Sequence, residues 1–140
     1  MTIDTPDSNT APASETLDAT TLSASLTVAD VAASVAWYRD VLGFTVHRSF
    51  ERDGTLFAAS LRAGAVPILL TRDDGKRGTE RTKGDGISLQ LTTKQDIDAL
   101  ASRARARGAA LDTEPSDVMG ARVFRLRDPD GFRLVISSER

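Results

Sequence analysis

The chain has 140 residues, of which 40% are hydrophobic and 27% are charged, a composition typical of one globular domain. Its 18 basic and 20 acidic residues give a net charge of −2 and are spread along the chain, which excludes a basic surface for nucleic acid or anionic lipid. The absence of cysteine excludes disulfides and thiolate chemistry, and no apolar run reaches the roughly 20 residues of a membrane span. We expect a cytoplasmic protein without a nucleic-acid or membrane partner.

Residues 1–21 differ in composition from the rest of the chain. They are rich in Thr, Ser, Asp, Pro and Ala and show almost no periodic apolar pattern, which predicts a disordered N-terminal tail. The basic start and continuous apolar stretch of a secretory signal are both missing. The folded domain is therefore expected to span residues 22–138.

A strand and a helix open the folded region. Residues 22–28 alternate apolar and hydroxyl or small side chains, the period-two pattern of a strand with one apolar face. Asp30 is placed to cap the helix that follows, in which apolar residues recur at helical spacing from Val31 to Leu42, and Gly43 supplies the stop. These signals predict a short amphipathic helix behind the first strand.

Three more strands complete the first half of the domain. Residues 44–50 and 55–61 flank an Asp53-Gly54 hairpin signal, and residues 66–71 form a further apolar run. Residues 72–85 contain no apolar side chain, so we expect them to bury nothing and to act as a linker. The linker is either a solvated connector or a lid over a binding site.

The second half repeats the order of the first. Residues 87–91 alternate like a strand, Thr93 is expected to cap a helix that ends at Gly108, and the Asp-Pro-Asp-Gly sequence at 128–131 predicts a tight turn. Three further strands are expected at residues 109–112, 122–127 and 132–137.

The two halves also align with each other. The offset is 63 residues between Leu26 and Leu89 and 67 residues between Gly64 and Gly131, with the strand ends and glycine stops in the same order. A repeat of this kind indicates an internal duplication.

The predicted fold is therefore α+β, with two tandem βαβββ modules in one domain. Module one is expected at 22–71, the linker at 72–85 and module two at 86–138. Each module should bury the apolar face of a curved mixed sheet against its helix, which leaves the opposite faces of the two sheets around a shared concave cavity.

Two stretches resemble a known family. The first helix with its flanks, from Val28 to Phe44, and the Asp-Pro-Asp-Gly turn between Phe124 and Phe132 are similar to the signatures of the vicinal oxygen chelate superfamily, which includes glyoxalases, bleomycin resistance proteins and extradiol dioxygenases. The similarity covers residues 22–138. Both motifs specify packing and a turn, so they support the fold more directly than a function.

The resemblance implies a divalent metal held between the two sheets. Enzymes of the family use His, Gln or Glu near the start of each module's first strand and Glu in its last strand. The first-strand positions fall here near Ser23 and Gly86, and the last-strand positions near Leu69 and Val135. None of these residues is a metal ligand of that kind, so we expect no metal and no other cofactor.

The single histidine, His47, lies in the second predicted strand. Alternation places Thr45, His47, Ser49 and Glu51 on one face, which would direct His47 into the cavity as a weak candidate for a catalytic base or as a ligand-binding donor. The alternative is an ordinary solvated histidine. His47 and Glu51 would lie about 13 Å apart at ~3.3 Å per residue, too far to share one ion.

The strand pattern selects a set of candidate ligand-binding residues. Small and neutral polar groups stand where the family's metal ligands would be, and two arginines could pair with an anionic group or could be ordinary solvated residues. The set is Ser23, Ser25, His47, Ser49, Gly86, Ser88, Gln90, Arg125, Arg133 and Val135.

These observations predict a metal-free protein that binds a small-molecule ligand, as the bleomycin-type members of the family do when they sequester a drug or metabolite. Related half-open sheets are completed across an interface, so a homodimer is expected. The chain has only seven aromatic residues, few for a groove that stacks planar drugs. One alternative is a lyase, isomerase or dioxygenase-like enzyme that uses His47, Glu51, Arg133 or an atypically bound metal; another is a structural or regulatory subunit.

Overall fold

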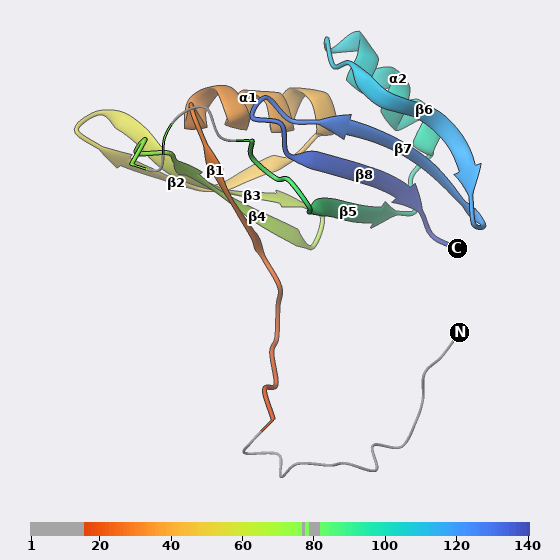
Figure 1. The fold of residues 1–140 in the computed structure, drawn as a ribbon, viewed down its shortest axis with the longest axis horizontal. Helices are drawn as coiled ribbons and strands as arrows, with labels where there is room; N and C mark the ends of the chain where they lie inside the picture. The colour runs from red at the N-terminus through yellow and green to blue at the C-terminus, as the bar shows by residue number, and fades with distance from the viewer. Residues whose placement is uncertain (1–15, 77, 79–81) are drawn as a thin grey trace.

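The computed structural model describes residues 16–76, 78 and 82–140, which form two helices and eight strands (Figure 1). The strands make two four-stranded sheets, and each sheet contacts one helix. No helix among the described residues is long and apolar enough to cross a membrane. The elements are β1 Ala24–Val28, α1 Val31–Leu42, β2 Thr45–Arg52, β3 Thr55–Ala63, β4 Val66–Arg72, β5 Ser88–Thr93, α2 Ile97–Ala106, β6 Leu111–Val118, β7 Ala121–Arg127 and β8 Arg133–Ser138.

The two sheets share one topology, which confirms the predicted pair of βαβββ modules in an α+β fold. Their strand orders are β1-β4-β3-β2 and β5-β8-β7-β6. In each module the first strand pairs in parallel with the last, and the other pairs are antiparallel. The parallel pair requires a crossover, and α1 and α2 supply it.

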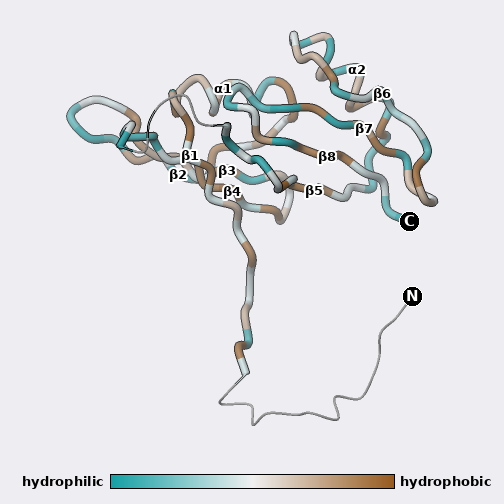
Figure 2. The backbone as a smooth tube through the Cα atoms, in the orientation of Figure 1, coloured by the Kyte–Doolittle hydropathy of each residue, from teal (hydrophilic) through white to brown (hydrophobic). Residues whose placement is uncertain are grey.

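One hydrophobic core joins the two modules. The buried sides of both sheets and the inner faces of both helices form a single cluster, whose largest fully buried side chains include Tyr38, Phe124, Leu61 and Leu70. Each fully buried aliphatic or aromatic side chain contributes about 1.5–3 kcal/mol through removal of apolar surface from water. In Figure 2 the turn between β2 and β3 is coloured as hydrophilic, whereas hydrophobic segments lie along the strands that form the core.

The ends of α1 follow the sequence signals and the start of α2 does not. The Asp30 carboxylate accepts a hydrogen bond from Ala33 N at 3.0 Å, and Gly43 ends α1 in the left-handed region at φ 79°. The predicted cap of α2 at Thr93 is wrong, because Asp96 caps this helix through Ala99 N. The Thr93 hydroxyl instead accepts a bond from Gln95 N, a local turn that precedes the helix.

The N-terminal boundary lies slightly inside the predicted one. β1 begins at Ala24, and residues 16–23 form no helix or strand. Leu22, expected on the apolar face of the strand, is 93% exposed. Residues 1–15, most of the predicted tail, lie outside the described residues.

β6 is longer than the sequence indicated. The strand was expected to end at residue 112, but it continues to Val118 through Pro115. Among the described residues β6 pairs only with β7, so it is an edge strand of the sheet. An edge strand tolerates a proline because one side of its backbone needs no partner. Its charged residues and its proline interrupt the alternation of apolar and polar side chains, so the sequence pattern did not predict the second half of the strand.

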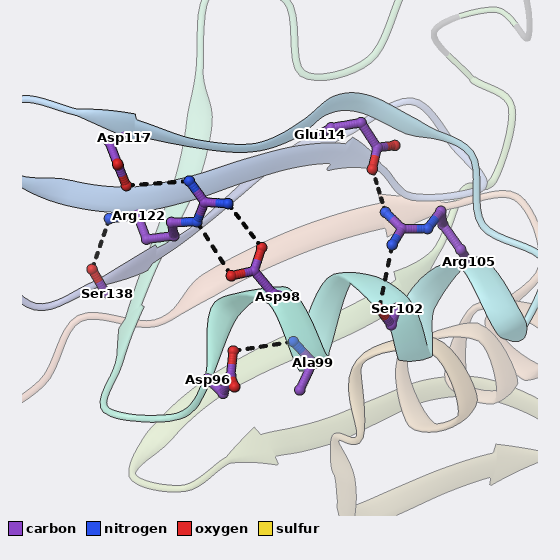
Figure 3. Close-up of polar contacts among 9 residues, drawn as sticks. All are labelled: Asp96, Asp98, Ala99, Ser102, Arg105, Glu114, Asp117, Arg122 and Ser138. Atoms are coloured by element: carbon purple, nitrogen blue, oxygen red, sulfur yellow. Dashed lines mark hydrogen bonds and ion pairs between the residues drawn. The ribbon is translucent and has the colours of Figure 1, made fainter.

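Ion pairs connect α2 to β6 and β7 of the second sheet (Figure 3). The Arg122 guanidinium contacts both Asp98 on α2 and Asp117 on β6, with N–O distances of 3.0 and 3.3 Å. The hydrogen bonds that the guanidinium donates to Asp98 and then to Asp117 raise the pKa of Arg122 above its ordinary value. A second pair joins Arg105 on α2 to Glu114 on β6.

Candidate functional site

Five of the six candidate residues of module two lie together on the side of the sheet opposite the helix, here called the open face. Gln90 on β5 pairs with Val135 on β8, which pairs with Arg125 on β7. Ser88 pairs with Arg133 one step away. Cross-strand partners point to the same face, so the five side chains form two adjacent rows. All five are exposed or half-buried.

Module one has an equivalent row on its open face. Ser25 on β1 pairs with Leu69 on β4, Leu69 with Ser60 on β3, and Ser60 with Arg48 on β2. Ser25 and Arg48 are exposed, and the central residues are half-buried. Ser23 precedes β1 and belongs to no strand.

The start of β5 also differs from the prediction. Gly86 lies before the strand in a turn with φ 80°, so it contributes no strand position to the row. Arg133 lies near this turn, with its guanidinium 3.9 Å from the Asp85 carboxylate. Both partners are largely exposed, and such a pair contributes little to stability.

Two irregularities in β2 overturn the predicted common face of Thr45, His47, Ser49 and Glu51. The register shifts between Val46 and Arg48, which leaves His47 without a cross-strand partner. Ser49 pairs with Ala59, a core residue, and so lies on the helix side of the sheet. A bulge adds one residue and reverses the alternation beyond it. Strict alternation missed this, and β2 is an edge strand whose exposed residues give no apolar pattern.

The residues at the family's metal positions do not fit a divalent ion. The neighbouring pairs on the open faces are Ser25 with Leu69 and Gln90 with Val135. Leucine and valine offer no donor atom, and hydroxyl and amide oxygens without a carboxylate make a weak set for the metals of this family. Within the described residues, no group of three or more His, Asp or Glu side chains is placed to hold a metal.

A buried hydrogen bond joins the two modules inside the core. The Tyr38 hydroxyl on α1 donates to Asp128 Oδ2 at 2.8 Å, and Asp128 Oδ1 accepts from Asp130 N and Phe132 N. Burial, then the neighbouring Asp128 carboxylate, raises the pKa of the Tyr38 phenol far above its ordinary value. Burial also raises the pKa of Asp128, although its hydrogen bonds oppose the change.

The linker contributes a half-buried cation, against the expectation that residues 72–85 bury nothing. The Lys83 ammonium lies 2.9 Å from Asp73 and 3.3 Å from Asp130, and it donates to Thr27 O at 3.0 Å. Only 13% of the Lys83 side chain is exposed. Asp130 also accepts from Ala29 N, so one carboxylate of the Asp-Pro-Asp-Gly turn holds the linker and module one together.

Two cavities lie apart from these rows. One, of about 870 Å³, lies between the modules, where the end of α1 and the β3–β4 turn meet β5 and α2. The other, of about 540 Å³, lies beside the β2–β3 turn and the end of β4. Neither is lined by any of the ten residues selected from the sequence. Sequence periodicity gives no signal for a cavity between two modules.

Comparison with known proteins agrees with this architecture. The chain is 23% identical to TioX from Micromonospora sp. ML1, with a TM-score of 0.69 and coverage of 87% of this chain and 100% of that one. It is 27% identical to a glyoxylase/bleomycin resistance protein/dioxygenase domain from Frankia sp. EAN1pec, with a TM-score of 0.69 and coverage of 89% and 94%. Virulence protein STM3117 from Salmonella typhimurium is 23% identical, with a TM-score of 0.68 and coverage of 89% and 100%.

A search of curated proteins finds no match. The model of the Glyoxalase/Bleomycin resistance protein/Dioxygenase superfamily matches residues 17–136, which include every helix and all the strands but the last two residues of β8. The match agrees with the duplicated topology and with the two motifs in the sequence. The chain therefore belongs to the glyoxalase, bleomycin resistance protein and dioxygenase superfamily.

Proposed function

We propose that this chain binds a small molecule on its open faces without a divalent metal, and that it sequesters a drug or metabolite rather than converting it. The observation that carries the proposal is the pair of replacements at Leu69 and Val135, because aliphatic side chains stand where the family's enzymes place a carboxylate. Gln90 and Ser25 beside them keep a neutral polar character.

The chemistry of the rows supports a ligand held by shape and hydrogen bonds. Val135 offers an apolar contact, the Gln90 amide can both donate and accept, and the Arg125 guanidinium can pair with an anionic group. Serine hydroxyls at the ends of the rows leave space between the larger side chains. This mixture of apolar surface and a few polar groups is usual in small-molecule sites.

A homodimer and a cytoplasmic location belong to the same proposal. The open face of each sheet is exposed in the single chain, and apolar side chains remain exposed beside it, among them Phe50 on β2 and Ile87 before β5. A second copy would cover such a face and enclose the ligand. The lack of cysteine accords with a reducing compartment.

A ligand screen with two tryptophan variants tests the proposal. A panel of small molecules is screened for a rise in the melting temperature in the presence of a metal chelator, since a ligand that binds the native state stabilises it. Gln90→Trp should abolish the rise, because the indole blocks the row on the open face. Gln95→Trp is the matched control, because Gln95 lies outside the rows and lines the cavity between the modules.

Two results of this screen would contradict the proposal, and they can be told apart. If ligands raise the melting temperature only when the chelator is left out, binding depends on a metal. If Gln95→Trp abolishes binding while Gln90→Trp leaves it intact, the ligand binds between the modules instead of on the open face.

A further inference from the structure

The cavity between the modules has an apolar lining. Phe44 and Ile136 are buried in its wall, Leu91 and Leu100 are half-buried, and Val66 is 42% exposed at its edge. These side chains come from both modules. The volume of about 870 Å³ lies within the range of roughly 300–1,000 Å³ that small-molecule sites occupy.

A guanidinium lies in the same wall. Arg103 on α2 reaches across to module one, where its Cζ and both terminal nitrogens lie 3.7 Å from the position that a Cβ on Gly43 would take. The guanidinium therefore lies close beside the end of α1. The position also suits a cation, because the C-terminal end of a helix carries partial negative charge.

No carboxylate neutralises this cation among the described residues. Two arginines nearby do have acidic partners. Arg105 on α2 forms an ion pair with Glu114, and Arg122 on β7 forms one with Asp98. The Arg103 side chain forms no ion pair or hydrogen bond within the part of the chain that the structure describes. The other charged groups of the lining are Lys94 and Glu139, so the wall carries one more positive than negative group.

We propose that this cavity binds a small amphiphilic carboxylate, with its aliphatic part among the apolar side chains and its carboxylate paired with Arg103. Guanidinium donors match a carboxylate in geometry, and charge-assisted bonds of this kind are stronger than neutral ones. Lys94 adds attraction for the anion, and Glu139 disfavours a second negative group on the ligand. The cavity shares no residue with the open-face rows, so this site is independent of the proposed function.

Octanoate is the probe, with 1-octanol as its neutral counterpart and acetate as a carboxylate without a chain. Each is titrated into the ¹⁵N-labelled full chain and followed by amide chemical shifts. Octanoate should saturate with shifts at Val66, Leu91 and Leu100, octanol should bind about tenfold more weakly, and acetate should not saturate. Arg103→Gln should weaken octanoate about tenfold, a difference of about 1.4 kcal/mol, and leave octanol unchanged.

Arg107→Gln is the matched control, because Arg107 is exposed at the end of the same helix and does not line the cavity. The proposal is overturned if Arg103→Gln weakens octanoate and octanol equally, which would mark a structural role for the arginine. It is also overturned if octanoate binds no better than octanol, or if its shifts lie outside the cavity. Ala65→Trp at the cavity edge should block octanoate; if it only changes the oligomeric state, the cavity is a contact between copies.

Discussion

At the scale of single residues, Tyr38 and Asp128 show how a family motif acts through chemistry as well as packing. Both side chains are buried, they come from different modules, and one hydrogen bond joins them. The sequence correctly predicted an amphipathic helix around Tyr38 and a tight turn that begins at Asp128. The sequence could not predict their contact, because the two residues are 90 positions apart. Neither the helical spacing nor the turn motif indicates which residue lies opposite.

Tyr38 is the only tyrosine in the chain, so its titration can be observed directly. Its pKa in the folded state lies far above the ordinary value of about 10. Above pH 10 the unfolded chain loses the phenol proton and the folded chain keeps it, so the folded state binds more protons and its stability falls as the pH rises. Phenolate absorbance should therefore appear only together with unfolding.

Tyr38→Phe is the control for that measurement. At neutral pH this variant should be less stable by about 1–3 kcal/mol in urea unfolding, because Asp128 loses a buried donor. The gap between the wild type and the variant should narrow above pH 10. Phenolate absorbance near pH 10 with an intact circular dichroism spectrum would contradict the account.

At the scale of elements, the linker fastens the two modules to each other. Lys83 bridges Asp73 at the end of β4 and Asp130 in the turn before β8. Its neighbour Gly84 lies so close to Phe132 that a Cβ would come within 2.9 Å of the ring. The composition of residues 72–85 predicted a connector without burial, because it shows which residues are polar but not that one of them pairs with two carboxylates.

Replacement of the bridging cation should cost much more than replacement of an exposed one. Lys83→Met removes the ammonium that lies between two largely buried carboxylates, so we expect a loss on the order of 3 kcal/mol in the free energy of unfolding. Lys76→Met removes a lysine whose side chain is 84% exposed and should cost less than about 0.5 kcal/mol. Equal losses in the two variants, measured by urea unfolding, would show that the bridge does not stabilise the domain.

The alternation of apolar and polar residues predicts the face on which a side chain lies in some strands and not in others. Period-two alternation placed Ser25, Gln90, Arg125 and Val135 correctly, because their strands are regular and have one buried face. The same rule misplaced Ser49, because a bulge in an edge strand leaves no trace in alternation alone. The orientation of side chains can therefore be predicted from sequence in regular strands with one buried face, but not in irregular, exposed strands.

At the scale of the whole molecule, the duplicated sequence predicts a duplicated architecture. Matching glycines and strand ends gave the module order, and the two sheets repeat one strand order. The cavity between the modules and the contacts of Lys83 could not be predicted in this way, because they depend on how one copy packs against the other. The repeat therefore gives no signal for the roles of Arg103 and Lys83, which depend on the residues that lie beside them in the other module.

The central claim is that this scaffold binds a small organic molecule in place of the superfamily's metal. Native mass spectrometry of the protein purified from its natural source tests that claim most directly, because one spectrum reports chain number, metal and ligand. We expect the mass of two chains of 15.0 kDa each, with an organic adduct that denaturation releases and no metal. One divalent metal ion per chain would contradict the account.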